Sequence, residues 1–153
     1  MKVLIVDDTD YKTESLRAFL KDCGCASEVQ VAKCFQTALR ALKEFQPTLV
    51  LLDMSLPTSQ RSDGELEGRD RIYGGKQLLA EMEFEDLTAT VIIVTQYDHF
   101  GEGPNAINLN SLLGQLQKRF PTLVAGGVYY SNVDSLWRDK LRTILRTNKF
   151  LTT

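Results

Sequence analysis

Three carboxylates lie directly after short apolar runs of the sequence. Asp7 and Asp8 follow the run Lys2–Val6, and Asp53 follows Leu49–Leu52. If these runs are neighbouring parallel strands, their carboxyl ends meet at one edge of a sheet and bring the three acids together. Clustered carboxylates raise one another's pKa unless a cation lies among them. Mg²⁺ suits such a cluster because it takes hard oxygen ligands, keeps several waters and favours sites that a phosphate completes.

A carboxylate beside such a metal can attack a phosphoryl donor and become an acyl phosphate. A hydroxyl would help at the same edge, and Thr95 ends another apolar run, 91–95. Its side chain would be placed to bond a phosphoryl oxygen. The residue types therefore predict a Mg²⁺-dependent phosphoryl-transfer site that contains Asp7, Asp8, Asp53 and Thr95.

The elements that would position these residues alternate between strand and helix along the chain. Short apolar runs rich in β-branched residues predict strands, and apolar residues at helical spacing predict helices. We expect strands at Lys2–Val6, Glu28–Ala32, Leu49–Leu52, 91–95 and 123–130, and helices at 11–23, 35–45, 75–84, 109–120 and after Asp134. Runs that are apolar on both faces belong to central parallel strands. The pattern predicts an α/β fold, a doubly wound parallel sheet of five strands in the order 2-1-3-4-5 with helices on both faces.

The last helix is expected to start at a cap provided by Asp134 and to turn one apolar face toward the sheet. That face would consist of Leu136, Trp137, Leu141, Ile144 and Leu145.

Two polar segments interrupt the alternation. Residues 1–153 are predicted to form a single domain with long loops at about 58–74 and 96–108, whereas strand-to-helix loops usually have about 2–6 residues. The first loop follows the strand that carries the central acid, so it is either a solvated loop or a lid or docking element. The glycine-containing turn before the third helix is either 63–64 or 74–75.

Composition excludes several classes of protein. The net charge of −2 provides no general attraction for nucleic acid or an anionic membrane, and no apolar run approaches the roughly 18 residues that span a bilayer. We therefore expect a cytoplasmic protein that binds neither directly. Cys23, Cys25 and Cys34 are expected to be reduced thiols, and the single histidine, His99, to be a surface residue.

The segment from Leu49 to Pro57 has an apolar run followed by Asp53-Met54-Ser55-Leu56-Pro57. It resembles the phosphoacceptor segment of bacterial response-regulator receiver domains, which have the CheY-like, flavodoxin-like fold. The run that ends in Asp7-Asp8 resembles the acidic pair of that family, and 91–95 resembles its fourth strand. The three motifs occur in the expected order and cover most of the chain.

The resemblance implies a role for each of these residues. Asp53 would be the phosphoacceptor and Thr95 the switch hydroxyl. Mg²⁺ would be held by Asp7, Asp8, Asp53 and the backbone carbonyl of Ser55. A histidine kinase or phosphotransfer protein would donate the phosphoryl group, and a downstream protein target would respond to it.

One departure from the family concerns the lysine at the end of the fifth strand, which pairs with the phosphoryl group. This chain has no lysine between Lys118 and Lys140. Ser131, Tyr130 or Tyr129 would occupy the position, and a hydroxyl cannot supply the charge of an ammonium group.

Three hypotheses therefore stay open. The first is a phosphorylated receiver, which is not an enzyme beyond self-catalysed phosphotransfer and autodephosphorylation. The second, favoured by the missing lysine, is a receiver-like interaction module that works independently of phosphorylation. The third is a phosphate-ester hydrolase with an aspartyl nucleophile. It is the weakest, because the segment after Asp53 lacks the second acid, two residues on, that haloacid-dehalogenase-like phosphatases use.

Overall fold

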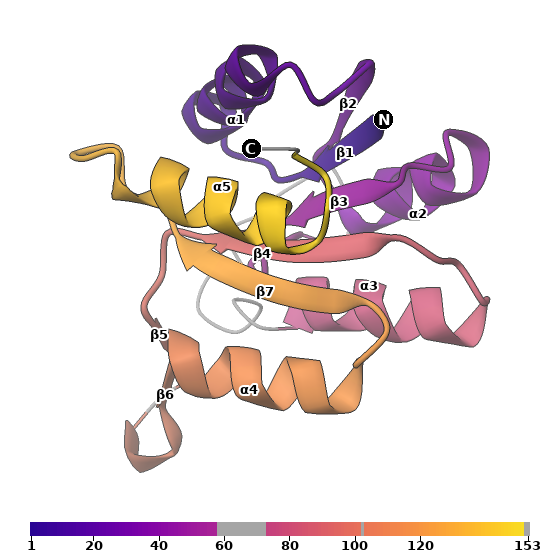
Figure 1. The fold of residues 1–153 in the computed structure, drawn as a ribbon. Helices are drawn as coiled ribbons and strands as arrows, with labels where there is room; N and C mark the ends of the chain where they lie inside the picture. The colour runs from indigo at the N-terminus through magenta and orange to yellow at the C-terminus, as the bar shows by residue number, and fades with distance from the viewer. Residues whose placement is uncertain (58–72, 102, 152–153) are drawn as a thin grey trace.

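The computed structural model describes residues 1–57, 73–101 and 103–151. Its main sheet has five parallel strands in the order β2-β1-β3-β4-β7, which confirms the predicted topology (Figure 1). The strands are β1 (Lys2–Val6), β2 (Glu28–Ala32), β3 (Leu49–Leu52), β4 (Thr90–Thr95) and β7 (Val124–Tyr129). The helices are α1 (Asp10–Cys23), α2 (Phe35–Glu44), α3 (Tyr73–Phe84), α4 (Leu109–Arg119) and α5 (Leu136–Thr147).

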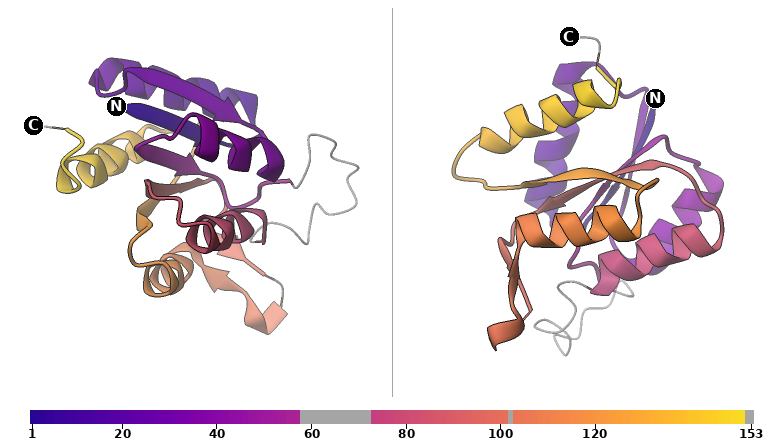
Figure 2. Two further views of the ribbon diagram at one scale, coloured as in Figure 1. Left: turned by 90° about the vertical axis from the view of Figure 1, so that its right-hand side faces the viewer. Right: turned by 60° about the horizontal axis from the view of Figure 1, so that its bottom comes forward.

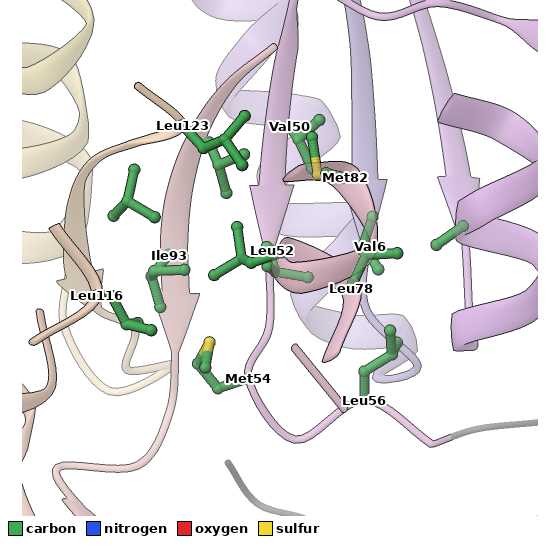
Figure 3. Close-up of a cluster of buried hydrophobic side chains, with 14 of the residues drawn as sticks. Val6, Val50, Leu52, Met54, Leu56, Leu78, Met82, Ile93, Leu116 and Leu123 are labelled. Atoms are coloured by element: carbon green, nitrogen blue, oxygen red, sulfur yellow. The ribbon is translucent and has the colours of Figure 1, made fainter. Parts of the chain in front are cut away.

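Helices cover both faces of the sheet, with α1 and α5 on one face and α2, α3 and α4 on the other (Figures 1 and 2). Alternate residues of a strand point to opposite faces, so each central strand contributes to two separate cores. In β3, Val50 and Leu52 pack toward α3, and Leu49 and Leu51 pack toward α1 and α5. Figure 3 shows Leu52 of the first core among side chains from neighbouring strands and α3. Burial on both faces explains why β3 is apolar at every position.

The strand register places the acids at one edge of the sheet. Val6 is paired with Leu52, so Asp7 and Asp53 are the next residues on two adjacent strands. The amide of Asp53 donates to the Val6 carbonyl at 2.9 Å, which continues the ladder by one step. The expectation that the two acids meet at the carboxyl edge of neighbouring strands is confirmed.

A pair of glycines brings the start of α3 against the chain that follows β3. A Cβ on Gly74 would lie 1.8 Å from the carbonyl oxygen of Leu56, and a Cβ on Gly75 would lie 2.8 Å from the Cα of Met54. The amide of Gly75 also donates to the Met54 carbonyl at 3.1 Å. Of the two turns left open by the sequence, 74–75 therefore lies within the first turn of α3, whereas 63–64 falls outside the described residues.

Two expectations about the loops and the last helix need correction. The segment 96–108 is not entirely loop, because β5 (His99–Phe100) and β6 (Ile107–Asn108) pair antiparallel and Gly103–Asn105 forms a short 3-10 helix. In this hairpin Phe100 is buried, which explains how a largely polar segment is anchored. Most of the other long loop, 58–72, lies outside the described residues.

In α5 the capping residue is Ser135 rather than Asp134, although an Asp134 oxygen accepts from the amide of Leu136 at 3.0 Å. Leu136 does not belong to the inner face, since it is 66% exposed, while Trp137, Leu141 and Leu145 are buried. Within the first turn of the helix, Trp137 therefore faces the core and Leu136 faces solvent. No helix in the described ranges is long and apolar enough to cross a membrane.

Candidate functional site

The acidic triad, defined as Asp7, Asp8 and Asp53, lies at the carboxyl edge of β1 and β3. One carboxylate oxygen from each residue lies within 4.8 Å of the others. Asp7 and Asp53 are buried at 1% and 3% exposure, and Asp8 is exposed. The triad thus has two acids inside the protein and one facing solvent.

A lysine from α1 enters the same cluster. The Nζ of Lys12 lies 2.6 Å from Oδ2 of Asp7 and 3.5 Å from Oδ1 of Asp53, and the lysine side chain is fully buried. Lys12 is in the first turn of α1, which starts only a few residues after the acidic pair. The helix therefore turns its N-terminal end, and this ammonium group, back over the edge of the sheet.

Hydrogen bonds satisfy only part of the cluster. The hydroxyl of Ser55 donates to Oδ2 of Asp53 at 2.8 Å, and the amide of Thr9 donates to Oδ1 of Asp7 at 2.9 Å. The remaining buried atoms are Asp7 Oδ2, Asp53 Oδ1 and Lys12 Nζ. Each carboxylate oxygen forms an ion pair with the ammonium, and none of the three atoms has a further hydrogen-bond partner among the described residues. Buried polar atoms in this condition are uncommon, and a bound ion or water is one way of satisfying them.

Burial raises the pKa of two acids of the triad, Asp7 and Asp8. Burial raises the pKa of Asp7 to about 6; the ammonium of Lys12 opposes this rise, and the charge of Asp53 adds to it. Burial also raises the pKa of Asp8, and the charge of Asp53 adds to that effect. In both residues the main cause is burial, which disfavours the charged carboxylate, and the negative charge of Asp53 is a smaller contribution.

The residues present fit a magnesium ion. The triad offers three carboxylates, two of which have a buried oxygen without a hydrogen bond, and such hard oxygen donors are what Mg²⁺ takes. Asp7, Asp8 and Asp53 would hold the ion, which would supply positive charge beside an incoming phosphate. The predicted role of the Ser55 carbonyl as a ligand stays a prediction. The structure shows a different contact for Ser55, the hydrogen bond from its hydroxyl to Asp53.

Thr95 lies at the end of β4, on the same edge of the sheet as the triad. Its side chain is fully buried, and its hydroxyl oxygen accepts from the amide of Tyr97 at 3.1 Å. Its carbonyl accepts from the amide of Tyr130 at 2.7 Å, which ties the ends of β4 and β7 together. The switch role of Thr95 stays a prediction. In this conformation its hydroxyl oxygen is bonded to the backbone two residues further along the chain.

The three candidates for the lysine position behave differently. Tyr130 is buried, its hydroxyl donates to the hydroxyl of Ser15 at 3.0 Å, and its ring centre lies 6.0 Å from the ammonium of Lys12. Ser131 accepts from the amide of Val133 at 3.1 Å, and Tyr129 is 45% exposed. Of the three, Tyr130 is therefore the residue that the structure places against the cationic group of the site.

Lys12 was missed by the sequence reasoning, although a signal for it exists. The inner face of α1 includes Leu16, Phe19 and Leu20, and Lys12 lies one turn before Leu16 on the same face. A lysine on the buried stripe of a helix requires a partner of opposite charge. The acids at positions 7 and 53 are the candidates that the predicted topology already provides.

The remaining candidates lie away from this chemistry. His99 is exposed, as expected, and its Nδ1 lies 2.9 Å from the carboxylate of Asp98. Cys23, Cys25 and Cys34 are free thiols.

Comparison with known proteins agrees with this geometry. The family model described as the response regulator receiver domain matches residues 3–122. The chain belongs to this family. The receiver is 27% identical, over 143 residues, to the Detocs response regulatory protein DtcB of Enterobacter cloacae, covering 92% of this chain and 95% of the relative. A protein of the same description from Vibrio alginolyticus is also 27% identical, over 150 residues, with 95% and 99% of the two chains covered.

Solved structures support the fold. A CheY-like response regulator receiver domain from Methanospirillum hungatei superimposes on this receiver with a TM-score of 0.62 at 20% identity, covering 95% of this chain and 91% of the other. Similarity at this level of identity concerns the architecture alone.

Proposed function

We propose that this receiver is a phosphoacceptor of a two-component phosphorelay, phosphorylated on Asp53 with Mg²⁺. The observation that carries the proposal is the acidic triad, in which the Asp53 carboxylate lies at a strand end within 4.8 Å of two further acids. A buried nucleophile with a metal-binding pair beside it is what transfer of a phosphoryl group to a carboxylate requires.

The proposed reaction involves one bond made and one broken. A carboxylate oxygen of Asp53 attacks the phosphorus of the donor, and the bond between phosphorus and the donor's leaving atom breaks. The leaving group departs with the electron pair, and Asp53 becomes an acyl phosphate. Attack of water on the phosphorus later returns the carboxylate and releases phosphate. Such a protein accepts and loses a phosphoryl group and does not turn over a separate substrate.

The partners follow from this chemistry. A histidine kinase or a phosphotransfer protein in the cytoplasm would present a phosphohistidine to Asp53. A downstream protein target would then bind one state of the receiver in preference to the other, since a ligand or modification acts by biasing two conformations. Thr95, buried at the same edge, is the hydroxyl proposed to follow the phosphoryl group.

One observation favours the alternative, an interaction module that works independently of phosphorylation. The ammonium of Lys12 already lies between Asp7 and Asp53, so the buried pair of the triad is partly neutralised without metal or phosphate. In that case the resting conformation would be the one that binds a partner.

The test is intact-mass spectrometry after incubation with acetyl phosphate, with and without Mg²⁺. We expect a Mg²⁺-dependent gain of one phosphoryl group in the parent and none in Asp53→Asn. The matched control is Asp86→Asn, because Asp86 is exposed in the turn before β4 and its positive φ of 55° suits asparagine. Absence of an adduct from both acetyl phosphate and a cognate kinase, in a folded protein that binds Mg²⁺, would leave the interaction module as the better hypothesis.

A further inference from the structure

Lys12 is a buried charge whose position calls for an explanation. Its side chain has no exposure to solvent, and lysine is almost never buried completely unless it is paired. Burying an ammonium group removes its hydration, and attraction to nearby charges has to offset that loss. The charges available to it are the carboxylates of Asp7 and Asp53. The residue is therefore positioned by the same acids that form the proposed site.

The ammonium group also has unused hydrogen-bonding capacity. A lysine has three N–H donors, and among the described residues the ammonium of Lys12 has only its ion-pair contacts, at 2.6 Å with Asp7 and at 3.5 Å with Asp53. Within the described part of the chain, the Asp53 oxygen nearest to Lys12 accepts no hydrogen bond. The contact with Asp7 can use one of the three donors, so an additional acceptor at Asp53 would meet an ammonium group with donors to spare.

Phosphorylation would supply such acceptors and would need a compensating cation. A phosphoryl group brings about −1.5 to −2 charge and three acceptor oxygens. Among the described residues, Lys12 provides the one lysine or arginine side chain that forms an ion pair with Asp53. Lys33, another lysine near this edge, is instead paired with Asp10 at 2.9 Å and half exposed.

We propose that Lys12 is the built-in counter-ion of the acidic triad, compensating Asp7 and Asp53 before phosphorylation and pairing with the phosphoryl group afterwards. The second half of this inference rests on the proposed phosphorylation of Asp53. The shorter contact, with Asp7, holds the ammonium in place, and the longer one, with Asp53, is exchanged for a contact with a phosphoryl oxygen. Lys12 is a residue of α1, so the cation of this receiver comes from a helix and not from the end of β7.

This arrangement has opposite consequences for two ligands. A Mg²⁺ ion and the ammonium group compete for the same carboxylates, so Lys12 weakens Mg²⁺ binding. The phosphoryl group, by contrast, gains a charge-assisted hydrogen bond from Lys12, a stronger contact than one between neutral groups. A variant without the charge should therefore bind Mg²⁺ more tightly and retain the phosphoryl group less well. A general folding defect would weaken both.

The experiment compares Lys12→Met and Lys12→Gln with Lys21→Met, which makes the same charge change at an exposed position of the same helix. Mg²⁺ affinity is measured by calorimetric titration without any phosphoryl donor. The yield and lifetime of the adduct are then measured by intact mass at saturating acetyl phosphate and Mg²⁺. Circular dichroism establishes that each variant is folded, and the two substitutions at position 12 guard against one of them failing to fold.

We expect both Lys12 variants to bind Mg²⁺ about tenfold more tightly and the adduct to be reduced about tenfold in yield or lifetime, corresponding to loss of one charge-assisted contact. Lys12→Arg, which retains the charge, should restore part of the adduct. Mg²⁺ affinity equal to that of Lys21→Met would overturn the proposal whatever the phosphorylation result, and so would a variant adduct as abundant and durable as the parent's. A parent protein that acquires no phosphoryl group would overturn the proposed function instead, and the Mg²⁺ titration would still decide whether Lys12 is the counter-ion of the triad.

Discussion

The close approach of α3 to the chain after Asp53 can be tested by adding one methyl group. In Gly75→Ala the new Cβ would lie 2.8 Å from both Cα and Sδ of Met54 and 3.1 Å from the carbonyl oxygen of Asp53. Separations below 3.0 Å are not found for real Cβ atoms, so either the helix or the backbone after Asp53 has to move. The sulfur can shift, but the Cα of Met54 belongs to the backbone and cannot move independently.

The size of the effect follows from the cost of overpacking. Inserting a methyl group into a tightly packed site typically costs about 1–3 kcal/mol. In a domain of this length, each kcal/mol changes the melting temperature by about 2–4 °C. We expect Gly75→Ala to lower the melting temperature by about 2–12 °C. Because the backbone next to Asp53 is displaced, Mg²⁺ affinity should fall as well.

Gly114→Ala is the matched control. Gly114 is exposed in α4, and a Cβ there would meet no other atom within 4 Å. Alanine in a helix interior is favoured over glycine by about 0.5–1 kcal/mol, so this variant should be slightly more stable than the parent. Thermal and urea unfolding, followed by circular dichroism, measure both variants. If Gly75→Ala proved as stable as Gly114→Ala, the contact between α3 and the acceptor segment would not be tight and the reasoning would be refuted.

Three further predictions concern the site itself. Because the folded pKa of Asp7 (about 6) exceeds its ordinary value of 3.8, this carboxyl stabilises the metal-free fold fully below pH 4, and that stability is lost as the pH rises through 6. In urea unfolding without Mg²⁺, the free energy of unfolding should fall with pH between these values by up to about 1.4 kcal/mol per pH unit. Asp7→Asn should remove this pH dependence, and an unchanged slope in that variant would contradict the assignment. Tyr130→Phe, which loses the hydroxyl contact with Ser15 at 3.0 Å, should lower the free energy of unfolding by about 1 kcal/mol in the same assay, and a neutral result would count against that hydrogen bond. Mg²⁺ should raise the melting temperature of the parent, and Asp8→Asn should reduce that shift whereas Asp86→Asn leaves it unchanged; equal shifts in both variants would place the metal elsewhere.

The fold was largely predictable because periodicity and burial agree along the chain. β3 is apolar at all its positions, and the structure buries it on both faces, so its central place in the sheet followed from composition alone. The acids at 7 and 53 were predictable for the same reason, since each directly follows such a strand. What periodicity could not predict was the end of an element. At the start of α5, Leu136 is exposed although the next residue, Trp137, is buried in the core.

The residues that sequence reasoning missed depend on tertiary contacts. Lys12 belongs to α1, whereas its partner Asp53 follows β3 and is distant in the sequence. A lysine near the start of a helix normally extends its charged group to solvent, so the local sequence alone does not pair the two. The hairpin of β5 and β6 was likewise hidden, because each strand is only two residues long and leaves no detectable alternation. In both cases the deciding information is which segments meet, and that is set by the whole fold and not by the local sequence.

The origin of the cation determines which elements respond to a charge change at Asp53. Lys12 belongs to α1, and the ring of Tyr130 lies 6.0 Å from its ammonium group. Tyr130 in turn bonds the carbonyl of Thr95 through its amide, and its ring packs against Trp137 of α5 with the centroids 5.1 Å apart. One buried tyrosine thus contacts α1, β4 and α5 at once. A phosphoryl group that draws Lys12 toward Asp53 would therefore act on the face of the sheet covered by α1 and α5, through packing that is already continuous from Lys12 to Trp137.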